Sequence, residues 1–380
     1  MKIALAHDFL IRWGGAEKVL FDFHKIFPEA PIFTLFHNEE FTKEKFPGVE
    51  IKSSYLQKKY QRNKNHRCLA PFMSVAVEDL DFSGYDLVIS SSSSFMKGII
   101  VSTKTKHICY LHTPTRWAWQ DYFEETRSNS FLKRLYVHFF RIWDYEASQR
   151  PDVIIANSKY TKNRIQKYYR RDSRVIYPSV EIKSSHSSVK DLQIQASNFE
   201  NYFVIVSRLV DYKHIDWAIK AFSKLKYKLV IIGEGPEYEN LKFKIQLSRQ
   251  GSLGSPGGSS NQKLKDKIIL KRQIKNKNNL LNLVRNSIGL IHLAEEDFGI
   301  AMIEALRLGK PVIAYNRGGA REIIKSGING ELFEKDNLKE QILKVAENIK
   351  KYKIINTKKT ASKFSENIFR KKIEREVACK

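Results

Sequence analysis

The chain has 380 residues, a net charge of +25 at pH 7 and 42% hydrophobic residues. This length suits two domains of roughly 150–200 residues, and 23 Phe, 17 Tyr and 5 Trp exclude a chain that is disordered throughout. A strongly positive field attracts anions such as nucleic acids, anionic lipids and phosphorylated small molecules. A compositional bias toward Lys would give the same charge, so the charge alone identifies no partner.

Nothing in the sequence indicates secretion or membrane insertion. The N-terminal apolar run is interrupted by His7 and Asp8, which makes it a poor signal peptide. No stretch reaches the roughly 18–20 apolar residues of a membrane span. Cys68, Cys109 and Cys379 are too far apart in the sequence for a zinc knuckle or a redox pair, and so few cysteines fit a reducing compartment. We therefore expect a cytoplasmic protein.

In the first half of the chain, short apolar strands alternate with helical segments. Residues 2–7 are predicted to form a strand, Gly14 and Gly15 a turn, and the following AEKVLFDFHKIF a helix. Paired glycines also let the backbone approach a phosphate closely, although a tight turn alone explains them. Further buried strands are predicted at 31–36, 85–90, 107–111 and 152–156. This alternation is typical of a parallel sheet covered by helices on both faces.

A second series of elements follows a polar, Ser-rich stretch at 186–200, which we interpret as a linker. Its strands are predicted at 202–206, 228–232, 267–270, 287–292 and 311–315, with a helix at 216–225. Residues 251–262 are of low complexity and predict a surface loop. The tail from Thr360 has apolar positions at helical spacing. The sequence thus predicts an α/β protein with two doubly wound domains, whose ligands bind beyond the carboxyl ends of the strands.

The most informative segment is AEEDFGIAMIEALRLGKPVIAYNRGGARE, residues 294–322. Glu296 is expected at a strand end, Phe298 and Gly299 at the turn into a helix, and Glu304 more than one turn inside that helix. The free N–H groups at the helix start favour an anion. One carboxylate near a reacting sugar and one accepting ribose hydroxyls would form a nucleotide-sugar site. The alternative is a surface helix with two solvated glutamates.

Two further segments place polar groups after buried strands. Arg208 follows one strand and Lys213 is expected to open the next helix. The planar guanidinium of the arginine and the compact ammonium group of the lysine suit a diphosphate. The alternative is two solvated cations in a Lys-rich protein. His112 follows another strand and could bond a sugar hydroxyl or stabilise developing charge, while Trp117 could stack on a sugar face. A core histidine and a packed aromatic pair are the alternative there.

These motifs resemble the retaining glycosyltransferase family numbered four, also called glycosyltransferase group 1. That family has the GT-B fold, in which two Rossmann-like doubly wound domains face a central cleft. Its Glu-x7-Glu motif is matched from Glu296 to Glu304, its Arg-x4-Lys pair by Arg208 and Lys213, and a further stretch by GEGPE at 233–237. HDFLIRWGGAEKV, YDLVISSSSSFMKG, CYLHTPTRWAW and ANSKYTKNRI also look like a bacterial subgroup that transfers mannose in O-antigen and capsule synthesis.

The resemblance implies a domain organisation and a set of roles. Residues 1–185 would bind the acceptor, 201–358 would bind the nucleotide-sugar, and 359–380 would form a helix returning to the N-terminal domain. The donor diphosphate would be bound by Arg208, Lys213 and Gly15, and the ribose by Glu304. The donor sugar would be contacted by Phe298, Gly299 and Ile300. The implied catalytic residues are Glu296 and His112, and the candidate sugar or acceptor contacts are Gly14 and Trp117.

The expected reaction is transfer of a sugar, with retention of configuration, to a lipid-linked or polysaccharide acceptor in cell-surface glycan synthesis. GDP-mannose is the preferred donor on subgroup resemblance. No cofactor is expected, and no metal is required because Arg208, Lys213 and a helix N-terminus would neutralise the diphosphate. Asp79 and Asp81 look like the metal-binding Asp-x-Asp pair of another glycosyltransferase fold, but they are expected between a helix and a strand.

Basic and aromatic residues mix at 52–67 and 131–143, which predicts contact with an anionic membrane surface and peripheral attachment to the inner face of the cell membrane. A solvated basic face and an ordinary core helix would explain the same residues. No specific nucleic acid is expected as a partner. Two alternatives remain for the whole protein: a GT-B enzyme with a soluble sugar acceptor, and a non-catalytic basic protein that binds nucleotide or nucleic acid.

Overall fold

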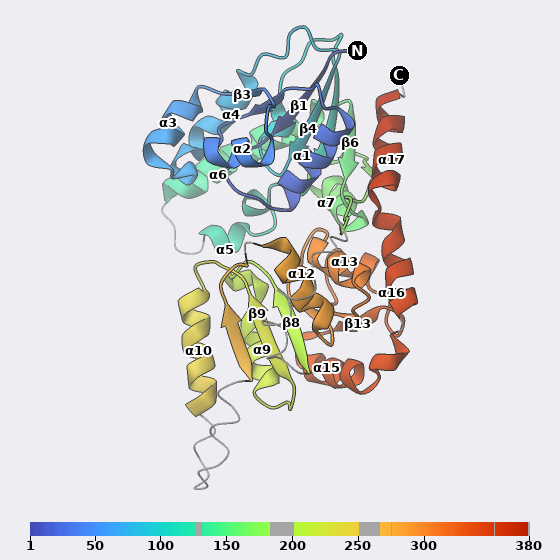
Figure 1. The fold of residues 1–380 in the computed structure, drawn as a ribbon. Helices are drawn as coiled ribbons and strands as arrows, with labels where there is room; N and C mark the ends of the chain where they lie inside the picture. Colours follow the sequence, from blue (N-terminus) through green and yellow to red (C-terminus); the bar gives the residue numbers. More distant parts are fainter. Residues whose placement is uncertain (127–130, 183–200, 251–266, 275, 353, 379–380) are drawn as a thin grey trace. The chain divides into compact units, whose positions relative to one another are not determined.

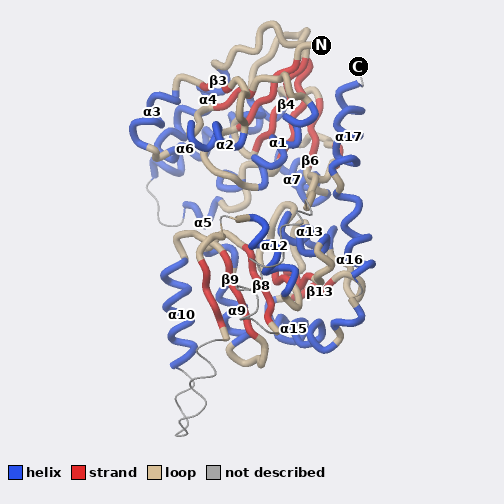
Figure 2. Tube along the Cα trace, in the orientation of Figure 1, coloured by secondary structure: helices blue, strands red, loops and turns tan. Residues whose placement is uncertain are grey.

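A computed structural model describes residues 1–126, 131–182, 201–250, 267–274, 276–352 and 354–378. The chain forms two compact units, Met1–Ser179 with Glu366–Lys380 and Val180–Ser365. Within the described residues, each unit contains one parallel sheet with helices packed on it (Figures 1 and 2). The predicted α/β class with two Rossmann-like domains is confirmed. The predicted linker at 186–200 and loop at 251–262 lie outside the described residues.

The sheet of the first unit has the strand order β3-β2-β1-β4-β5-β6-β7. Its strands are β1 (Ile3–His7), β2 (Ile32–Thr34), β3 (Ile51–Ser53), β4 (Leu87–Ser92), β5 (Lys106–Leu111), β6 (Val153–Ala156) and β7 (Arg174–Val175). The helices are α1 (Gly15–Ile26), α2 (Glu39–Lys45), α3 (Leu56–Asn63), α4 (Ala70–Glu78), α5 (Tyr122–Thr126), α6 (Phe131–Gln149), α7 (Lys159–Tyr169) and α17 (Glu366–Ala378). The edge strands β3 and β7 were not predicted, because each is too short to show an apolar run.

Alternating residues of β1 show how helices cover both faces of this sheet. Ala4 and Ala6 belong to a core with α4 and α6, to which Met73 and Phe140 contribute. Leu5, on the opposite face, belongs to a core with α1 and α17. Successive strand residues point to opposite faces, so a strand that is apolar throughout is buried on both sides. This accounts for the continuous apolar runs that predicted the strands.

The sheet of the second unit has the strand order β10-β9-β8-β11-β12-β13. Its strands are β8 (Tyr202–Val206), β9 (Lys228–Ile232), β10 (Ile268–Lys271), β11 (Leu290–His292), β12 (Val312–Tyr315) and β13 (Gly330–Phe333). The helices are α9 (Ile215–Phe222), α10 (Tyr238–Gln250), α12 (Lys277–Asn286), α13 (Ile300–Arg307), α14 (Ala320–Ile323), α15 (Leu338–Glu347) and α16 (Ile354–Ala361). Its main core joins Phe203 and Ile205 of β8 to Ile342 and Val345 of α15. Only β13 was not predicted.

Short 3-10 turns connect several of these elements: His66–Leu69, Met96–Gly98, Arg116–Ala118, Asp211–Lys213, Lys335–Asn337, Ile349–Lys351 and Ser362–Phe364. The last of them separates α16 from α17, so the helical tail expected from Thr360 is two helices. No helix in the described ranges is both long and apolar enough to cross a membrane.

Helix α17 packs against the first unit although it lies at the end of the chain (Figure 1). Phe369 places its ring 5.5 Å from that of Phe23 in α1. Lys25 Nζ lies 3.1 Å from Glu366 Oε2, and Glu376 forms an ion pair with Arg174 of β7. An apolar contact flanked by two ion pairs therefore attaches this helix to the face that α1 covers.

Candidate functional site

The turn after β8 carries Arg208 and Lys213, two of the three predicted diphosphate ligands. Arg208 lies two residues after the strand and is exposed. Lys213 ends a 3-10 turn, and α9 begins two residues later at Ile215, so Lys213 precedes the helix instead of opening it. Lys213 is buried, and its Nζ contacts Glu296 Oε1. A buried ammonium group that pairs with one carboxylate among the described residues is well suited to bind a further anion.

The GEGPE segment determines the shape of that turn. The N–H of Leu209 donates to the carbonyl of Glu234 at 2.9 Å, and the N–H of Glu237 donates to the carbonyl of Leu209 at 3.1 Å. A Cβ at Gly233 or Gly235 would collide with the backbone oxygen of Ser207 or Leu209. The two glycines therefore permit a close backbone approach that holds the neighbouring Arg208 turn in place.

The carboxylate of Glu296 lies where two cationic or titratable side chains meet. Its Oε1 contacts Lys213, and its Oε2 lies 3.8 Å from Nε2 of His292 at the end of β11. The carbonyl of Glu296 accepts a hydrogen bond of 2.8 Å from Gly319, and a Cβ at Gly318 would collide with that carbonyl. The glycine pair of RGGARE therefore fixes the backbone that presents this carboxylate.

Gly299 is the N-cap residue of helix α13 and lies three residues after Glu296. Its φ of 97° is in the left-handed region, and a Cβ there would collide with Met302 and approach Glu296 Oε2 to 3.5 Å. Phe298 is buried with its ring 5.4 Å from Phe364, and Ile300 is the first residue of the helix. The expected order of strand, turn and helix is confirmed, whereas the sugar contacts of these three residues stay predictions.

Glu304 is the fifth residue of α13, more than one turn inside the helix as expected. It also forms an ion pair that the sequence did not predict. Its Oε1 lies 2.6 Å from Nζ of Lys277, the first residue of α12. The Glu304 side chain is 13% exposed and that of Lys277 is 55% exposed. Lys277 stands in a Lys- and Asn-rich run, KNKNN, which gave no signal distinguishing it from a solvated residue.

His292 is a second residue that the sequence did not indicate. It is buried, and among the described residues its Nε2 has no hydrogen-bond partner. Burial lowers its pKa; the Glu296 carboxylate acts in the opposite direction and Lys213 reinforces the lowering. The imidazole is therefore neutral near pH 7 and contributes a dipole to the site, but no charge.

In the first unit, His112 follows β5 directly. Its N–H donates to the Ser92 carbonyl at 2.8 Å, and its carbonyl accepts from Asn157 Nδ2 at 2.9 Å. Its Nε2 lies 2.8 Å from Ser91 Oγ. Burial lowers the pKa of the ring to about 3, with a smaller contribution from nearby His7. His112 is therefore a neutral imidazole held by backbone and side-chain hydrogen bonds on several sides.

Gly14 and Gly15 form the start of α1. Gly14 is the extended N-cap residue and Gly15 is the first residue of the helix. A Cβ at Gly14 would lie 2.8 Å from Oε2 of Glu17. The predicted turn is thus present, and at Gly14 the Glu17 carboxylate leaves little room for a side chain.

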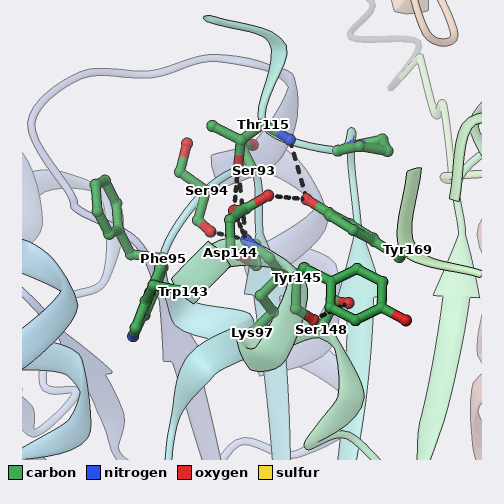
Figure 3. A network of polar contacts seen from close by, with 12 residues as sticks. Ser93, Ser94, Phe95, Lys97, Thr115, Trp143, Asp144, Tyr145, Ser148 and Tyr169 are labelled. Carbon is green, nitrogen blue, oxygen red and sulfur yellow. Dashed lines mark hydrogen bonds and ion pairs between the residues drawn. The ribbon is translucent and has the colours of Figure 1, made fainter. Parts of the chain in front are cut away.

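The loop after His112 is held by a buried polar network (Figure 3). Lys97 Nζ lies 2.6 Å from Asp144 Oδ1, and the two side chains are 1% and 0% exposed. Asp144 also accepts hydrogen bonds of 2.7 Å from Thr115 Oγ1, Trp119 Nε1 and Tyr169 Oη. This network joins the 3-10 turn at 96–98 to α6, α7 and the Thr115–Trp119 segment.

Trp117 packs inward instead of standing free. Its ring lies 4.2 Å from Phe140 and is stacked on Tyr136 at 6.1 Å. With Trp119 bound to Asp144, both indoles stabilise the loop. Contact between Trp117 and a sugar stays a prediction.

The Asp79–Asp81 segment has a local structural role. Asp79 is the C-cap residue of α4, and Asp81 Oδ1 accepts a hydrogen bond of 2.7 Å from the N–H of Ser83. The part of the chain that the structure describes contains no group of three or more His, Cys, Asp or Glu residues placed to hold a metal ion.

Comparisons with known proteins match both units. A family model described as Glycosyltransferase Family 4 matches residues 13–184, and one described as Glycosyl transferases group 1 matches residues 200–349. Alpha-1,3/1,6-mannosyltransferase ALG2 of Saccharomyces cerevisiae is 31% identical over 53% of this chain and 45% of its own length. An uncharacterized glycosyltransferase of Methanocaldococcus jannaschii is 29% identical over 58% of this chain and 57% of its own length. The chain thus spans about half the length of these curated relatives.

Solved structures resemble the whole chain. HepE of Anabaena, crystallised in complex with UDP-glucose, aligns over 100% of both chains with a TM-score of 0.72 and 20% identity. WaaG, described as a glycosyltransferase involved in lipopolysaccharide biosynthesis, aligns equally completely with a TM-score of 0.71 and 13% identity. At these identities the likeness shows a shared fold.

Proposed function

We propose that this chain, which carries a family 4 and a group 1 glycosyltransferase domain and has the GT-B fold, transfers a sugar from a nucleotide-sugar donor to a glycan acceptor. The observation that carries the proposal is the contact of buried Lys213, five residues after Arg208, with Glu296, four residues before the start of α13. A cation, a carboxylate and a helix N-terminus are gathered at the carboxyl ends of β8 and β11. These are the groups that a charged diphosphate and a sugar require.

In this proposal the second unit binds the donor. Lys213 and Arg208 neutralise the diphosphate, Glu304 accepts ribose hydroxyls, and Glu296 with the backbone at Phe298–Ile300 contacts the sugar. As the bond from the sugar to the diphosphate breaks, negative charge grows on the leaving oxygen. Each well-placed donor or cation stabilises such charge by about 3–4 kcal/mol. His112 and Gly15, from the first unit, would act at the sugar and the phosphate.

We further propose that the anomeric configuration is retained by attack on the face from which the diphosphate leaves. Glu296 is paired with Lys213, so it is poorly placed to act as a covalent nucleophile. The acceptor oxygen forms a bond to the anomeric carbon while the bond from that carbon to the diphosphate oxygen breaks. The acceptor proton passes to the departing phosphate oxygen. No separate base is then needed.

GDP-mannose is the donor we favour, and the mannosyltransferase relatives support it. HepE was crystallised with UDP-glucose, so uridine donors belong in the same test. We expect one donor from a panel of GDP-, UDP-, ADP- and dTDP-sugars to be turned over, and Glu304→Ala to weaken its binding because ribose hydroxyls lose their acceptor. Turnover and KM should be measured by nucleotide release.

Glu347→Ala, at the exposed end of α15, is a matched control that should behave as wild type. If folded wild-type protein neither binds nor turns over any donor, the glycosyltransferase proposal is wrong. Salt-sensitive binding to DNA or RNA would then favour the nucleic-acid alternative.

We propose a lipid-linked acceptor at an anionic membrane surface, supported by helix α6. One side of this helix exposes Phe131, Leu135, Phe139 and Ile142, which are 75%, 40%, 61% and 53% exposed. Their spacing of three and four residues places them along one stripe. Lys133, Arg134 and Arg141 lie on the same helix. Apolar residues with adjacent cations fit the boundary between lipid headgroups and acyl chains.

The protein should float with vesicles containing phosphatidylglycerol, and Phe131→Ser with Phe139→Ser should reduce the bound fraction at least ~10-fold. Burial of one such side chain is worth about 1.5–3 kcal/mol. Ile355→Ser, at a residue 71% exposed on α16, is the matched control for loss of one exposed apolar side chain. Wild-type protein that remains unbound to anionic vesicles at low salt would remove the membrane proposal and favour a soluble acceptor.

A further inference from the structure

A series of polar contacts between side chains connects Glu17 of α1 to His112. Ser91 Oγ lies 2.8 Å from His112 Nε2 on one side and 3.1 Å from His7 Nδ1 on the other. The second nitrogen of His7, Nε2, lies 3.7 Å from Oε1 of Glu17. His7 is 3% exposed and Ser91 is fully buried. Four groups, from α1, β1, β4 and the residue after β5, are thus connected in series.

The strand order produces this arrangement. β4 lies between β1 and β5, and its Ser91 is in register with His7. The same serine is in register with Tyr110 of β5, two residues before His112. Because successive strand residues point to opposite faces, the preceding Ser90 points away from this series of contacts. Its Oγ lies 2.8 Å from Nε2 of another buried histidine, His107.

The charge of Glu17 determines which group donates and which accepts in each of these hydrogen bonds. At 3.7 Å the carboxylate is too distant for a hydrogen bond, but its charge favours an N–H on the facing Nε2 of His7 over a lone pair. With a proton on Nε2 and a lone pair on Nδ1, His7 accepts a hydrogen bond from the Ser91 hydroxyl. The Ser91 oxygen then accepts from Nε2–H of His112. The proton of His112 is thereby placed on Nε2.

We propose that Glu17, His7 and Ser91 are positioning residues that hold His112 as its Nε2–H tautomer, so that its Nδ1 accepts a hydrogen bond from a hydroxyl of the sugar substrate. The identity of that ligand as a sugar rests on the proposed function. Among the described residues Nδ1 of His112 makes no hydrogen bond, and the ring is too deeply buried to be protonated near pH 7. The opposite tautomer would present an N–H instead and repel a donating hydroxyl.

The tautomer can be measured directly by long-range proton–nitrogen NMR correlation on protein labelled with ¹⁵N-histidine, with the His112 signals assigned by their loss in His112→Gln. We expect the Nε2–H form in wild type. Ser91→Ala should yield a mixture of tautomers, because the link to His7 is cut, and Ser91→Thr should restore the wild-type form. Glu17→Gln should shift the population toward Nδ1–H.

Ser90→Ala is the matched control, since it removes an equally buried hydroxyl from the adjacent residue and from another histidine. It should leave the His112 tautomer unchanged. A wild-type His112 protonated on Nδ1, or a Ser91→Ala spectrum indistinguishable from that of Ser90→Ala, would overturn the proposal. This readout needs no substrate, so it stands even where donor turnover fails and the proposed function is wrong.

Kinetics supply a second readout. We expect Ser91→Ala and Glu17→Gln to lower kcat for the active donor by about 10–100-fold, as loss of an orienting partner does at metal-bound histidines. Loss of a tautomer-fixing carboxylate from a catalytic histidine can cost up to about 10⁴-fold. Ser91→Thr should recover activity together with the tautomer. A variant that changes the tautomer but not kcat would show that the acceptor nitrogen has no part in the reaction.

Discussion

Replacing Lys213 with alanine is expected to lower kcat for the active nucleotide-sugar by about 10²–10³-fold, the usual cost of removing one preorganised group from a developing anion. Lys213 is buried, and its ammonium group contacts Glu296. In low-dielectric surroundings such a charge is stronger than it would be in water. Steady-state kinetics with the donor identified in the panel measure the effect.

Two comparisons separate this expectation from a general loss of structure. Lys224→Ala removes an exposed lysine just after α9 in the same unit and should leave kcat unchanged. Lys213→Arg keeps the charge but not the compact ammonium geometry, so partial activity is expected. If Lys213→Ala retains more than half of wild-type kcat with an unchanged circular dichroism spectrum, Lys213 does not bind the leaving group.

The second large effect concerns stability. Replacing Lys97 with methionine is expected to lower the free energy of unfolding of the first unit by about 3–5 kcal/mol, the usual cost of breaking a buried ion pair. Methionine preserves much of the side-chain volume, but Asp144, which is 0% exposed, would keep its charge without a cation. Three hydrogen-bond donors remain on that carboxylate and offset part of the loss. Urea denaturation followed by tryptophan fluorescence measures the change, because Trp119 is part of the network.

The controls for this variant are an exposed pair and a double variant. Lys45→Met removes the partner of Glu44, whose side chain is 69% exposed, and should cost less than about 1 kcal/mol. Lys97→Met combined with Asp144→Asn removes both charges. The double variant should lose less free energy of unfolding than the two single variants lose together. Equal costs for Lys97→Met and Lys45→Met would mean that the buried pair contributes no more than a surface pair.

The sequence also indicated the local structure around the predicted donor-binding residues. Strand β11, the turn at Gly299 and the position of Glu304 within α13 follow from apolar runs and from a glycine in the left-handed region. These are local properties, because they depend on neighbouring residues and on backbone conformation. Lys213 was predicted to open the helix but precedes it, because a 3-10 turn ending at Lys213 and the left-handed residue His214 come before α9.

Pairing between distant residues could not be predicted in this way. Lys277 meets Glu304 across 27 residues, and Lys213 meets Glu296 across 83. The connection from His7 to Ser91 and on to His112 depends on β4 lying between β1 and β5. Strand order and register are set by the packing of whole helices and sheets. From the sequence alone, a run of serines therefore predicts only a polar strand end and does not show which histidine each serine contacts.

By itself, the sequence determined two α/β domains, the strands and turns that present the motif residues, and the types of charge available at their ends. The tertiary structure alone decided which charges meet, that Trp117 packs against α6, and that Ser90 and Ser91 serve different histidines. The physical reason is the distance along the sequence over which each effect acts. Periodicity and backbone preference act within a few residues, whereas partner choice follows from strand order, register and burial across the whole unit.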